Sequence, residues 1–407
     1  MRKKEIGTRG RGAAENESMR LAKSRQKRTI VLLARTLNLV ACCCSIAVST
    51  SNAARAGDHS ANLPSPKSSA QSSEPRQAKP LPAPARWRGL IGEYGLDGDI
   101  LYILEKDGRL CALFKRVELA PLQEISKNNF KFPEHGPRAG QRLVFKRHAT
   151  GRATQVEVEN VAFKRRQVGP EAGAMQLRVK PLRPIPELLR EARAAQPPKE
   201  SGTFRAPDLV ELRRLDPTIK LDIRYATTNN LFGTVFYSEA RAFMQRPAAE
   251  ALVRINHKLR QMGYGLLIHD AYRPWYVTKV FWDATPVEKK LFVADPSKGS
   301  RHNRGAAVDL TLYDLKAGKP VEMASTYDET TDRAYPDYPG GTSLQRWHRD
   351  LLRAAMEAEG FTVYEAEWWH FDYKDWQQYP IMNVPFERVV ISTLKPLAAK
   401  LLGLTPP

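Results

Sequence analysis

Residues 57–86 limit where this chain can build a folded core, because the stretch contains almost no large apolar side chains. It is rich in proline, serine and alanine, and such a composition cannot bury enough surface to offset the entropy lost on ordering. We therefore predict a disordered linker here, with the folded domains on its carboxyl-terminal side. The chain has 407 residues, which is enough for two modest domains besides linkers.

Residues 1–56 have the pattern of an export signal. A basic stretch precedes the apolar run TIVLLARTLNLVACCCSIAV, and small residues follow it. Arg35 interrupts the run, which argues against a stable membrane span, and we expect cleavage near Ala53–Ala56. Translation could instead begin at Met19. We predict a periplasmic protein; the alternative, from the motif LVAC, is a lipoprotein held at the membrane through acylated Cys42.

The net charge of +20 is typical of nucleic-acid-binding proteins, but its distribution is not. Residues 1–56 hold twelve Lys/Arg and three Asp/Glu, which accounts for nine of those charges. The obvious basic cluster in the remainder, Lys164–Arg166, lacks the interleaved aromatic residues of a base-stacking surface. We therefore predict no nucleic-acid partner. After signal cleavage only Cys111 remains, so any metal site must use histidine and carboxylate ligands.

Residues 87–165 are predicted to form a small all-β accessory domain. The sequence DILYILEKDGRLCALFKRVEL is two β-rich runs around Lys106-Asp107-Gly108, which indicates a hairpin. A second pair of runs surrounds Thr150-Gly151, and the run TQVEVENVAF alternates apolar and polar residues. No catalytic combination of residues is visible in this region. Its hypothetical ligand is the cell wall.

Beyond this region the pattern changes to alternating helices and strands. Residues 166–207 are predicted to be a linker with one short helix, PELLREARAAQ, and residues 208–385 an α+β domain. Amphipathic periodicity predicts a helix in RPAAEALVRINHKLRQMG and another in TSLQRWHRDLLRAAMEAEG, with Ser343 as the N-cap of the second. GLLIHD and FTVYEAEWWHFDY are predicted strands. Residues 386–407 form a tail without a motif.

Residues that could carry hydrolytic chemistry are spread through the α+β region. His302, Asp309 and His370 offer two nitrogens and one oxygen, and a catalytic zinc wants three protein ligands plus an open position. Zinc lowers the pKa of bound water to about 7. Glu367 is close enough in sequence to His370 to act as general base, and Arg273 could stabilise a developing oxyanion. Each residue alone also fits a turn, a core strand or a structural ion pair.

A family resemblance decides between these readings. The blocks LDIRYATTNNLFG, GYGLLIHDAYRPW, SKGSRHNRGAAVDLTLYDL, MASTYDE and EAEWWHFDY resemble the VanX-type D-alanyl-D-alanine dipeptidases, which are zinc peptidases. The resemblance implies a central sheet flanked by helices and a small closed pocket. It implies one zinc ion per chain, with His302, Asp309 and His370 as ligands, Glu367 as base and Arg273 polarising the scissile carbonyl. It further implies that Asp328 binds the substrate's free amino group and that Ser300 lines the pocket.

We therefore predict a zinc dipeptidase that hydrolyses D-alanyl-D-alanine or a related short D-containing peptide in cell-wall turnover. The nearest rival is a D,D- or L,D-carboxypeptidase acting on peptidoglycan stem peptides. A rival of another class is a non-catalytic cell-wall-binding protein that uses the β-region as its binder. Among the other histidines, His269 is expected at a strand end near the site, and His257 and His348 are expected to be solvated on helices.

Overall fold

The computed structural model describes residues 78–169 and 178–389. The predicted export signal with Cys42, most of the 57–86 linker and residues 390–407 of the predicted tail lie outside these ranges. The described residues belong to one compact unit. None of the helices in the described ranges combines the length and the apolar character needed to cross a bilayer.

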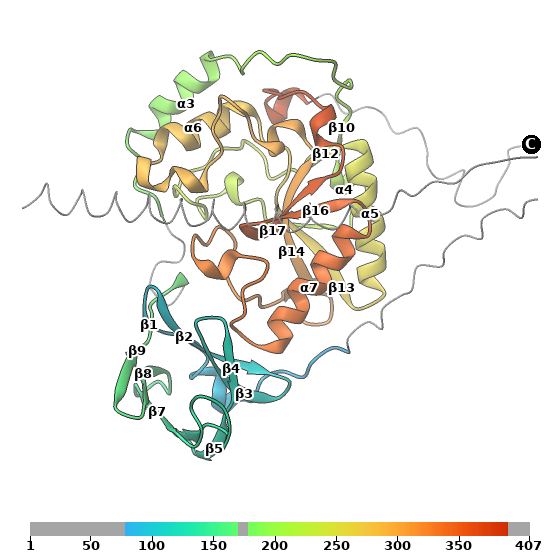
Figure 1. The fold of residues 1–407 in the computed structure, drawn as a ribbon. Helices are drawn as coiled ribbons and strands as arrows, with labels where there is room; N and C mark the ends of the chain where they lie inside the picture. Colours follow the sequence, from blue (N-terminus) through green and yellow to red (C-terminus); the bar gives the residue numbers. More distant parts are fainter. Residues whose placement is uncertain (1–77, 170–177, 390–407) are drawn as a thin grey trace, which may run out of the picture. The chain divides into compact units, whose positions relative to one another are not determined.

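Two antiparallel sheets make up residues 85–169, which we call the β-rich segment (Figure 1). A one-turn helix, α2 (Ala85–Arg88), precedes nine strands: β1 (Gly92–Leu96), β2 (Asp99–Lys106), β3 (Arg109–Phe114), β4 (Glu118–Pro121), β5 (Gln123–Ser126), β6 (Asn129–Lys131), β7 (Arg142–Arg147), β8 (Ala153–Val158) and β9 (Val161–Lys164). The sheet orders are β1-β2-β3-β4 and β5-β6-β7-β8-β9, and a bridge between Tyr94 and Arg165 joins the two outer edges. The sheets share one apolar core that includes Trp87, Tyr94, Phe130 and Phe145.

Turn chemistry explains the strand boundaries of the β-rich segment. The predicted hairpin between β2 and β3 is confirmed: Asp107 and Gly108 both have positive φ, as a tight hairpin turn requires. The alternating run TQVEVENVAF, however, does not form one strand. It folds back between β8 and β9 at Glu159, which also has positive φ. The glutamate gives no turn signal in the sequence because it is not one of the residues that favour this conformation.

The remaining elements belong to residues 185–389, the C-terminal segment. Its helices are α3 (Ile185–Ala194), α4 (Leu212–Leu215), α5 (Arg246–Arg260), α6 (Trp275–Ala284) and α7 (Ser343–Glu357), with 3-10 turns η2 (Arg224–Ala226), η3 (Val287–Phe292), η4 (Arg301–Arg304), η5 (Asp332–Ala334), η6 (Trp376–Gln378) and η7 (Phe386–Arg388). Its strands are β10 (Leu209–Glu211), β11 (Lys220–Leu221), β12 (Phe243–Gln245), β13 (Tyr264–Asp270), β14 (Ala307–Asp314), β15 (Lys319–Pro320), β16 (Phe361–Tyr364) and β17 (Glu367–Tyr373). The predicted mixture of helices and sheet is confirmed.

A six-stranded sheet organises the C-terminal segment. Its order is β11-β13-β14-β17-β16, with β15 paired to β14, and only the pair β11 with β13 is parallel. Helices α5 and α7 pack against this sheet and against each other, whereas α3 packs on α6 (Figure 1). The helices and the sheet strands other than β15 contribute to one apolar core. Phe386, the first residue of the predicted tail, is buried in that core beside Tyr237 and Phe243.

Helix α7 corrects two predictions. Its N-cap is Thr342, whose hydroxyl accepts a hydrogen bond from the Gln345 N–H while the Gln345 side chain returns to the Thr342 N–H. The prediction of Ser343 as the cap was wrong by one residue. The prediction of a solvated His348 was also wrong: its ring is buried and its Nε2 lies 3.1 Å from the Tyr264 hydroxyl. Burial, with Lys79 nearby, lowers the pKa of His348 to about 4.

Candidate metal centre and pocket

Strand register brings together two of the three predicted metal ligands. Asp309 on β14 and His370 on β17 are direct cross-strand partners, so their side chains emerge side by side on one face of the sheet. His302 comes from η4, immediately before β14. Gly305 turns the chain from η4 into that strand with a φ of 68°, and a Cβ there would meet Leu209 at 2.6 Å. Glycine is therefore required where the chain reverses.

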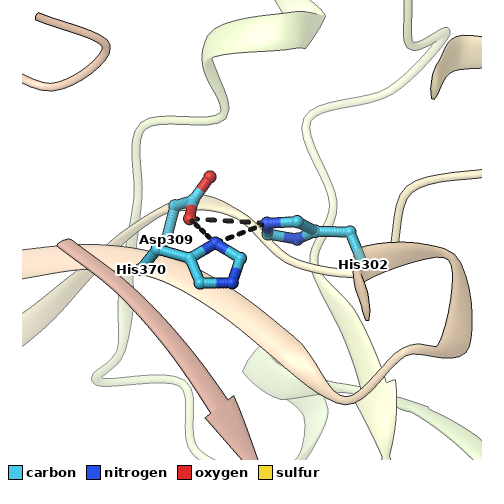
Figure 2. Close-up of side chains that lie close together, drawn as sticks. All are labelled: His302, Asp309 and His370. Carbon is cyan, nitrogen blue, oxygen red and sulfur yellow. Dashed lines mark hydrogen bonds and ion pairs between the residues drawn. The ribbon is translucent and has the colours of Figure 1, made fainter. Parts of the chain in front are cut away.

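The three side chains point toward one another (Figure 2). His302 Nε2 lies 3.1 Å from His370 Nδ1 and 3.4 Å from Asp309 Oδ1, and His370 Nδ1 lies 3.0 Å from the same carboxylate oxygen. All three are buried. Among the described residues, they form the one group of three or more histidine, cysteine or acidic side chains close enough to share an ion.

Further contacts fix which atom of each histidine faces the centre. His302 Nδ1 lies 2.7 Å from the Ala271 carbonyl oxygen, to which it can donate, and this leaves Nε2 as the ligand atom. His370 is held the other way round, because its Nε2 lies 3.0 Å from Asp372 Oδ1. Arg301 pairs with the other oxygen of Asp372 at 2.7 Å. Such outer contacts orient metal-binding imidazoles and fix their tautomers.

Asp309 is held by a tyrosine. Tyr327 donates from its hydroxyl to Asp309 Oδ2 at 3.0 Å, which leaves Oδ1 directed at the two histidines. The Tyr327 ring is itself stacked on His269 at 4.7 Å, and His269 Nδ1 lies 3.4 Å from Asp222 Oδ2. His269, expected near the site, thus supports the centre through Tyr327. A stacked, buried ring limits the positions available to the hydroxyl.

The donor set fits a divalent cation such as zinc. Burial alone would raise the pKa of Asp309, but His302 and His370 hold that pKa well below its usual range. Burial would lower the pKa of His370, yet its hydrogen bonds to Asp309 and Asp372 raise it to about 10. Two neutral imidazoles and a carboxylate are the nitrogen and oxygen ligands that zinc accepts, and cation binding would displace the extra proton on His370.

Glu367 stands at the edge of this centre. Its Oε2 lies 3.9 Å from His370 Nδ1, and 30% of its side chain is exposed to the pocket. Desolvation by the surrounding protein raises the pKa of Glu367; His370 opposes the shift and Asp309 adds to it. A carboxylate with a raised pKa that faces open space is suited to taking up a proton and giving it back.

Arg273 supplies the positive charge of the pocket. Its Nε and Nη2 bind Asp270 Oδ2 at 2.9 and 2.7 Å, and its Nη2 lies 4.0 Å from Asp309 Oδ2. The guanidinium also packs over the rings of Tyr225 and Phe281. Burial alone would lower the pKa of Arg273, but Asp270 acting together with Tyr225, Tyr237 and Tyr327 outweighs burial and raises it. The residue therefore stays charged in a fixed orientation.

The two predicted substrate-binding residues differ in their surroundings. Asp328 is 3.4 Å from the Tyr225 hydroxyl, and burial together with the charges of Asp309 and Glu367 raises its pKa to about 8. A bound cationic group would favour its ionised form. Ser300 lines the same pocket, but its hydroxyl already accepts the His302 N–H at 3.3 Å as the cap of η4. Ser300 therefore has a structural role as the cap of η4, besides its place in the pocket wall.

A single cavity of about 480 Å³ unites these residues. It is lined by the triad, by Glu367 and Arg273, and by Asp328 and Ser300, together with aromatic side chains that include Tyr225, Phe281, Tyr364 and Trp376. This volume lies in the range of small-molecule sites. The structure thus brings all seven predicted site residues to one pocket.

Sequence reasoning assigned no supporting role to three residues around the centre. Asp372 lies two positions after His370, and strand alternation alone would have placed both side chains on one face. Asp270 lies directly before the segment that carries Arg273 and pairs across the sheet with Asp309. Tyr327 gave no signal, because nothing in MASTYDE shows that its hydroxyl reaches Asp309.

A buried triad of two histidines and an aspartate, with a glutamate and an arginine facing the same cavity, defines a metallopeptidase site. A family model for D-ala-D-ala dipeptidases, peptidase family M15, matches residues 205–389. The D-alanyl-D-alanine dipeptidase of Escherichia coli K12 is 33% identical over 179 residues, which cover 44% of this chain and 91% of the relative. The chain belongs to the D-alanyl-D-alanine dipeptidase family, as its motifs suggested.

Other relatives match the same part of the chain. The D-alanyl-D-alanine dipeptidases of Enterococcus faecium and Enterococcus faecalis are 34% and 32% identical, and each match covers 40% of this chain and 89% of the relative. The solved structure of the LdcB LD-carboxypeptidase is 20% identical over 45% of this chain and 78% of that chain, with a TM-score of 0.25, a likeness too weak to bear on function. The family match begins after the β-rich segment ends.

Proposed function

We propose that this protein is an exported zinc dipeptidase that hydrolyses D-alanyl-D-alanine or a closely related D-containing dipeptide during cell-wall peptide turnover. The observation that carries the proposal is the meeting of His302, Asp309 and His370 in one buried cluster, beside Glu367 and lining one cavity. The family membership of the chain supports the same activity.

Zinc is the cation that we propose for the centre, because its two nitrogens and one oxygen match a catalytic zinc site with one open position. When bound, zinc would polarise the scissile carbonyl and acidify a water molecule. The chain's own residues supply the rest. Glu367 takes the proton from the attacking water and later delivers it to the leaving amine. Arg273 holds positive charge where the carbonyl oxygen becomes negative.

Asp328 provides selectivity for a free dipeptide. Its carboxyl group is buried near Asp309 and Glu367, so a substrate ammonium would favour its ionised form and pair with it. A peptide whose amino group is acylated would lose this ion pair. Ser300 closes the wall near the bound peptide. The pocket therefore favours a short peptide over a long stem peptide.

Export and wall contact complete the proposal. The sequence pattern of residues 1–56 supports delivery to the periplasm, either as a soluble protein or as a lipoprotein attached through Cys42. There the enzyme would act on released wall fragments. We also propose that residues 87–165 act as an accessory domain, for which contact with the cell wall is one role.

Metal analysis coupled to a peptide panel tests the proposed activity. The purified full chain should contain one zinc per molecule and should hydrolyse D-alanyl-D-alanine faster than L-alanyl-L-alanine or an N-acylated D-alanyl-D-alanine tripeptide. A chelator should abolish hydrolysis, and added zinc should restore it. Faster cleavage of the acylated tripeptide would instead identify a carboxypeptidase. Absence of zinc and of hydrolysis would point to a non-catalytic wall protein.

A further inference from the structure

We propose that the β-rich segment is a positioning element of the pocket, which holds the loop of residues 321–342 so that Asp328 faces the substrate's amino group. The inference rests on the proposed function, because it takes Asp328 as the ammonium-binding residue. It assigns to the β-rich segment a role in catalytic selectivity that is separate from any contact with the cell wall.

The 321–342 loop needs external support. Asp328 has a φ of 61°, a left-handed conformation that aspartate tolerates better than most side chains but that remains sterically unfavourable for a residue with a Cβ. Tyr327, its neighbour, holds the ligand Asp309. A strained residue keeps its conformation only where surrounding contacts over-determine it. Between β15 and α7, this loop contains no regular element longer than the three-residue turn η5. Its supports must therefore come from other parts of the fold.

The first support lies directly behind Asp328. Glu329 is buried, and its carboxylate accepts hydrogen bonds from the Thr326 N–H at 3.2 Å and the Thr331 hydroxyl at 2.7 Å. This carboxylate sits against Gly169, at the end of the β-rich segment. A Cβ at position 169 would lie 2.5 Å from Glu329 Oε2. The backbone of the β-rich segment thus forms the wall against which the loop is folded.

An arginine joins the same two regions. Arg333 donates through Nε to the Ala324 carbonyl at 2.9 Å, at the start of the loop, and through Nη1 to the Val168 carbonyl at 3.4 Å. Its Nε also lies 3.5 Å from Glu329. One guanidinium therefore connects the loop to the residue before Gly169.

The second support is a buried contact further along the loop. Tyr338 donates from its hydroxyl to Glu93 Oε1 on β1 at 2.9 Å, and both residues are buried. The Tyr338 ring meets Tyr102 of β2 edge-on. Ala324 and Tyr338 form a small apolar cluster with side chains of β2 and β3: Tyr102, Leu104, Cys111 and Leu113. Side chains on one face of this sheet thus pack against the loop.

The third support fixes the end of the loop. Glu105, at the tip of the β2–β3 hairpin, accepts the Ser343 N–H at 2.8 Å through Oε2, so a carboxylate occupies the N-terminus of α7. The carbonyl of Glu105 accepts Arg346 Nη2 at 2.7 Å. The β-rich segment therefore holds the loop at three places: next to Asp328, at Tyr338 and at the start of α7.

Two variants test the proposal in the full chain. Gly169→Ala forces Glu329 away from its place, and Tyr338→Phe removes the hydroxyl bonded to Glu93. Each should increase deuterium uptake by residues 323–331. With zinc supplied in excess, each should raise the KM for D-alanyl-D-alanine by about tenfold, the effect of misplacing one charge-assisted contact, while kcat changes less. The preference for the free dipeptide over its N-acetylated form should fall in parallel.

Matched controls separate this effect from general damage. Gly136→Ala places a Cβ at another positive-φ glycine where nothing lies within 4 Å, and Tyr335→Phe removes a hydroxyl from an exposed ring on the same loop. Neither should change uptake or KM. Unchanged uptake, or raised uptake with unchanged KM and preference, in both test variants would overturn the inference. If the wild-type protein fails to cleave the dipeptide, the proposed function falls, whereas the uptake measurement still decides whether the β-rich segment holds the loop.

Discussion

The β-rich segment and the pocket of the C-terminal segment both bury carboxylates, and they differ in how those groups are satisfied. Glu93 accepts hydrogen bonds from Tyr338 through one oxygen and from Arg166 through the other. Glu105 accepts the Ser343 N–H and a second N–H within its own hairpin. Each oxygen of these two carboxylates has a donor. Buried carboxylates of this kind stabilise an architecture.

The pocket places its acidic groups against one another instead. Asp309, Asp328 and Glu367 face one cavity, and their mutual repulsion contributes to the raised pKa values of Asp328 and Glu367. A protein gains no stability from such an arrangement. The comparison teaches that buried acids with complete sets of donors mark structure, whereas crowded acids around open space mark function.

The strongest test of this comparison is the substitution Glu367→Gln. We expect hydrolysis to fall by about 10³-fold, because an amide cannot take up the proton, while bound metal and thermal stability remain near wild type. Steady-state kinetics with metal analysis and a melting curve would measure this. Glu365→Gln, at an exposed position two residues earlier, is the control. If Glu367→Gln lowered the melting temperature and left hydrolysis near wild type, Glu367 would be a structural carboxylate like Glu93 and Glu105.

The substitution Asp328→Asn should have the next largest effect. We expect KM for the free dipeptide to rise about 30-fold, since a charge-assisted contact contributes about 2 kcal/mol, with little change for an N-acetylated dipeptide. Removing one of the crowded charges should also leave the protein at least as stable. Asp337→Asn, at an exposed site on the same loop, should alter neither value. Equal losses for both substrates would argue that Asp328 does not bind the amino group.

The substitution Tyr327→Phe separates support of the metal from chemistry. Without the hydroxyl, Asp309 loses the contact that directs Oδ1 toward the histidines, so zinc affinity should fall about tenfold. Competition with a chromogenic chelator measures this affinity without turnover. Tyr313→Phe serves as the control, because that hydroxyl bonds the Gly318 carbonyl at an exposed site on β14. An unchanged zinc affinity in Tyr327→Phe would show that the strands alone hold Asp309.

The smallest expected effect concerns His348, a buried ionisable group with no role in the pocket. Its pKa of about 4 lies below the unfolded value of about 6.5, so its contribution to stability is complete above pH 6.5 and is lost as the pH falls toward 4. Between pH 7 and 5.5 this amounts to about 1 kcal/mol of unfolding free energy. His348→Gln should flatten that slope in denaturant melts, whereas substitution of the exposed His257 should not.

Sequence and structure agree where local chemistry decides the outcome. The helix of residues 246–260 follows from its apolar spacing and from Pro247, and the β2–β3 hairpin follows from Asp107-Gly108. The candidate ligands could be named because histidines and acids in a family's order are a specific signal. Their meeting point could not, since it depends on a cross-strand register between residues 309 and 370.

The missed features share a physical cause. Tyr327 acts through its hydroxyl on a residue 18 positions earlier, and Glu93 meets a loop 245 positions later. No periodicity in the sequence encodes contacts of that range. His348 shows the same limit, because its place on an amphipathic helix gave no sign that Tyr264 of β13 would cover it. Composition identifies which groups can react, and only the packed fold shows which groups restrain them.

The direct pairing of Asp309 with His370 also has a consequence for how the protein folds. Sliding β17 by one residue along β14 would turn His370 to the opposite side of the sheet and separate two of the three donors. A cation can bind tightly only to the correctly aligned strands, so ion binding would lower the free energy of that alignment alone. An ion bound at this centre would then also stabilise the correct register of β14 and β17 during refolding.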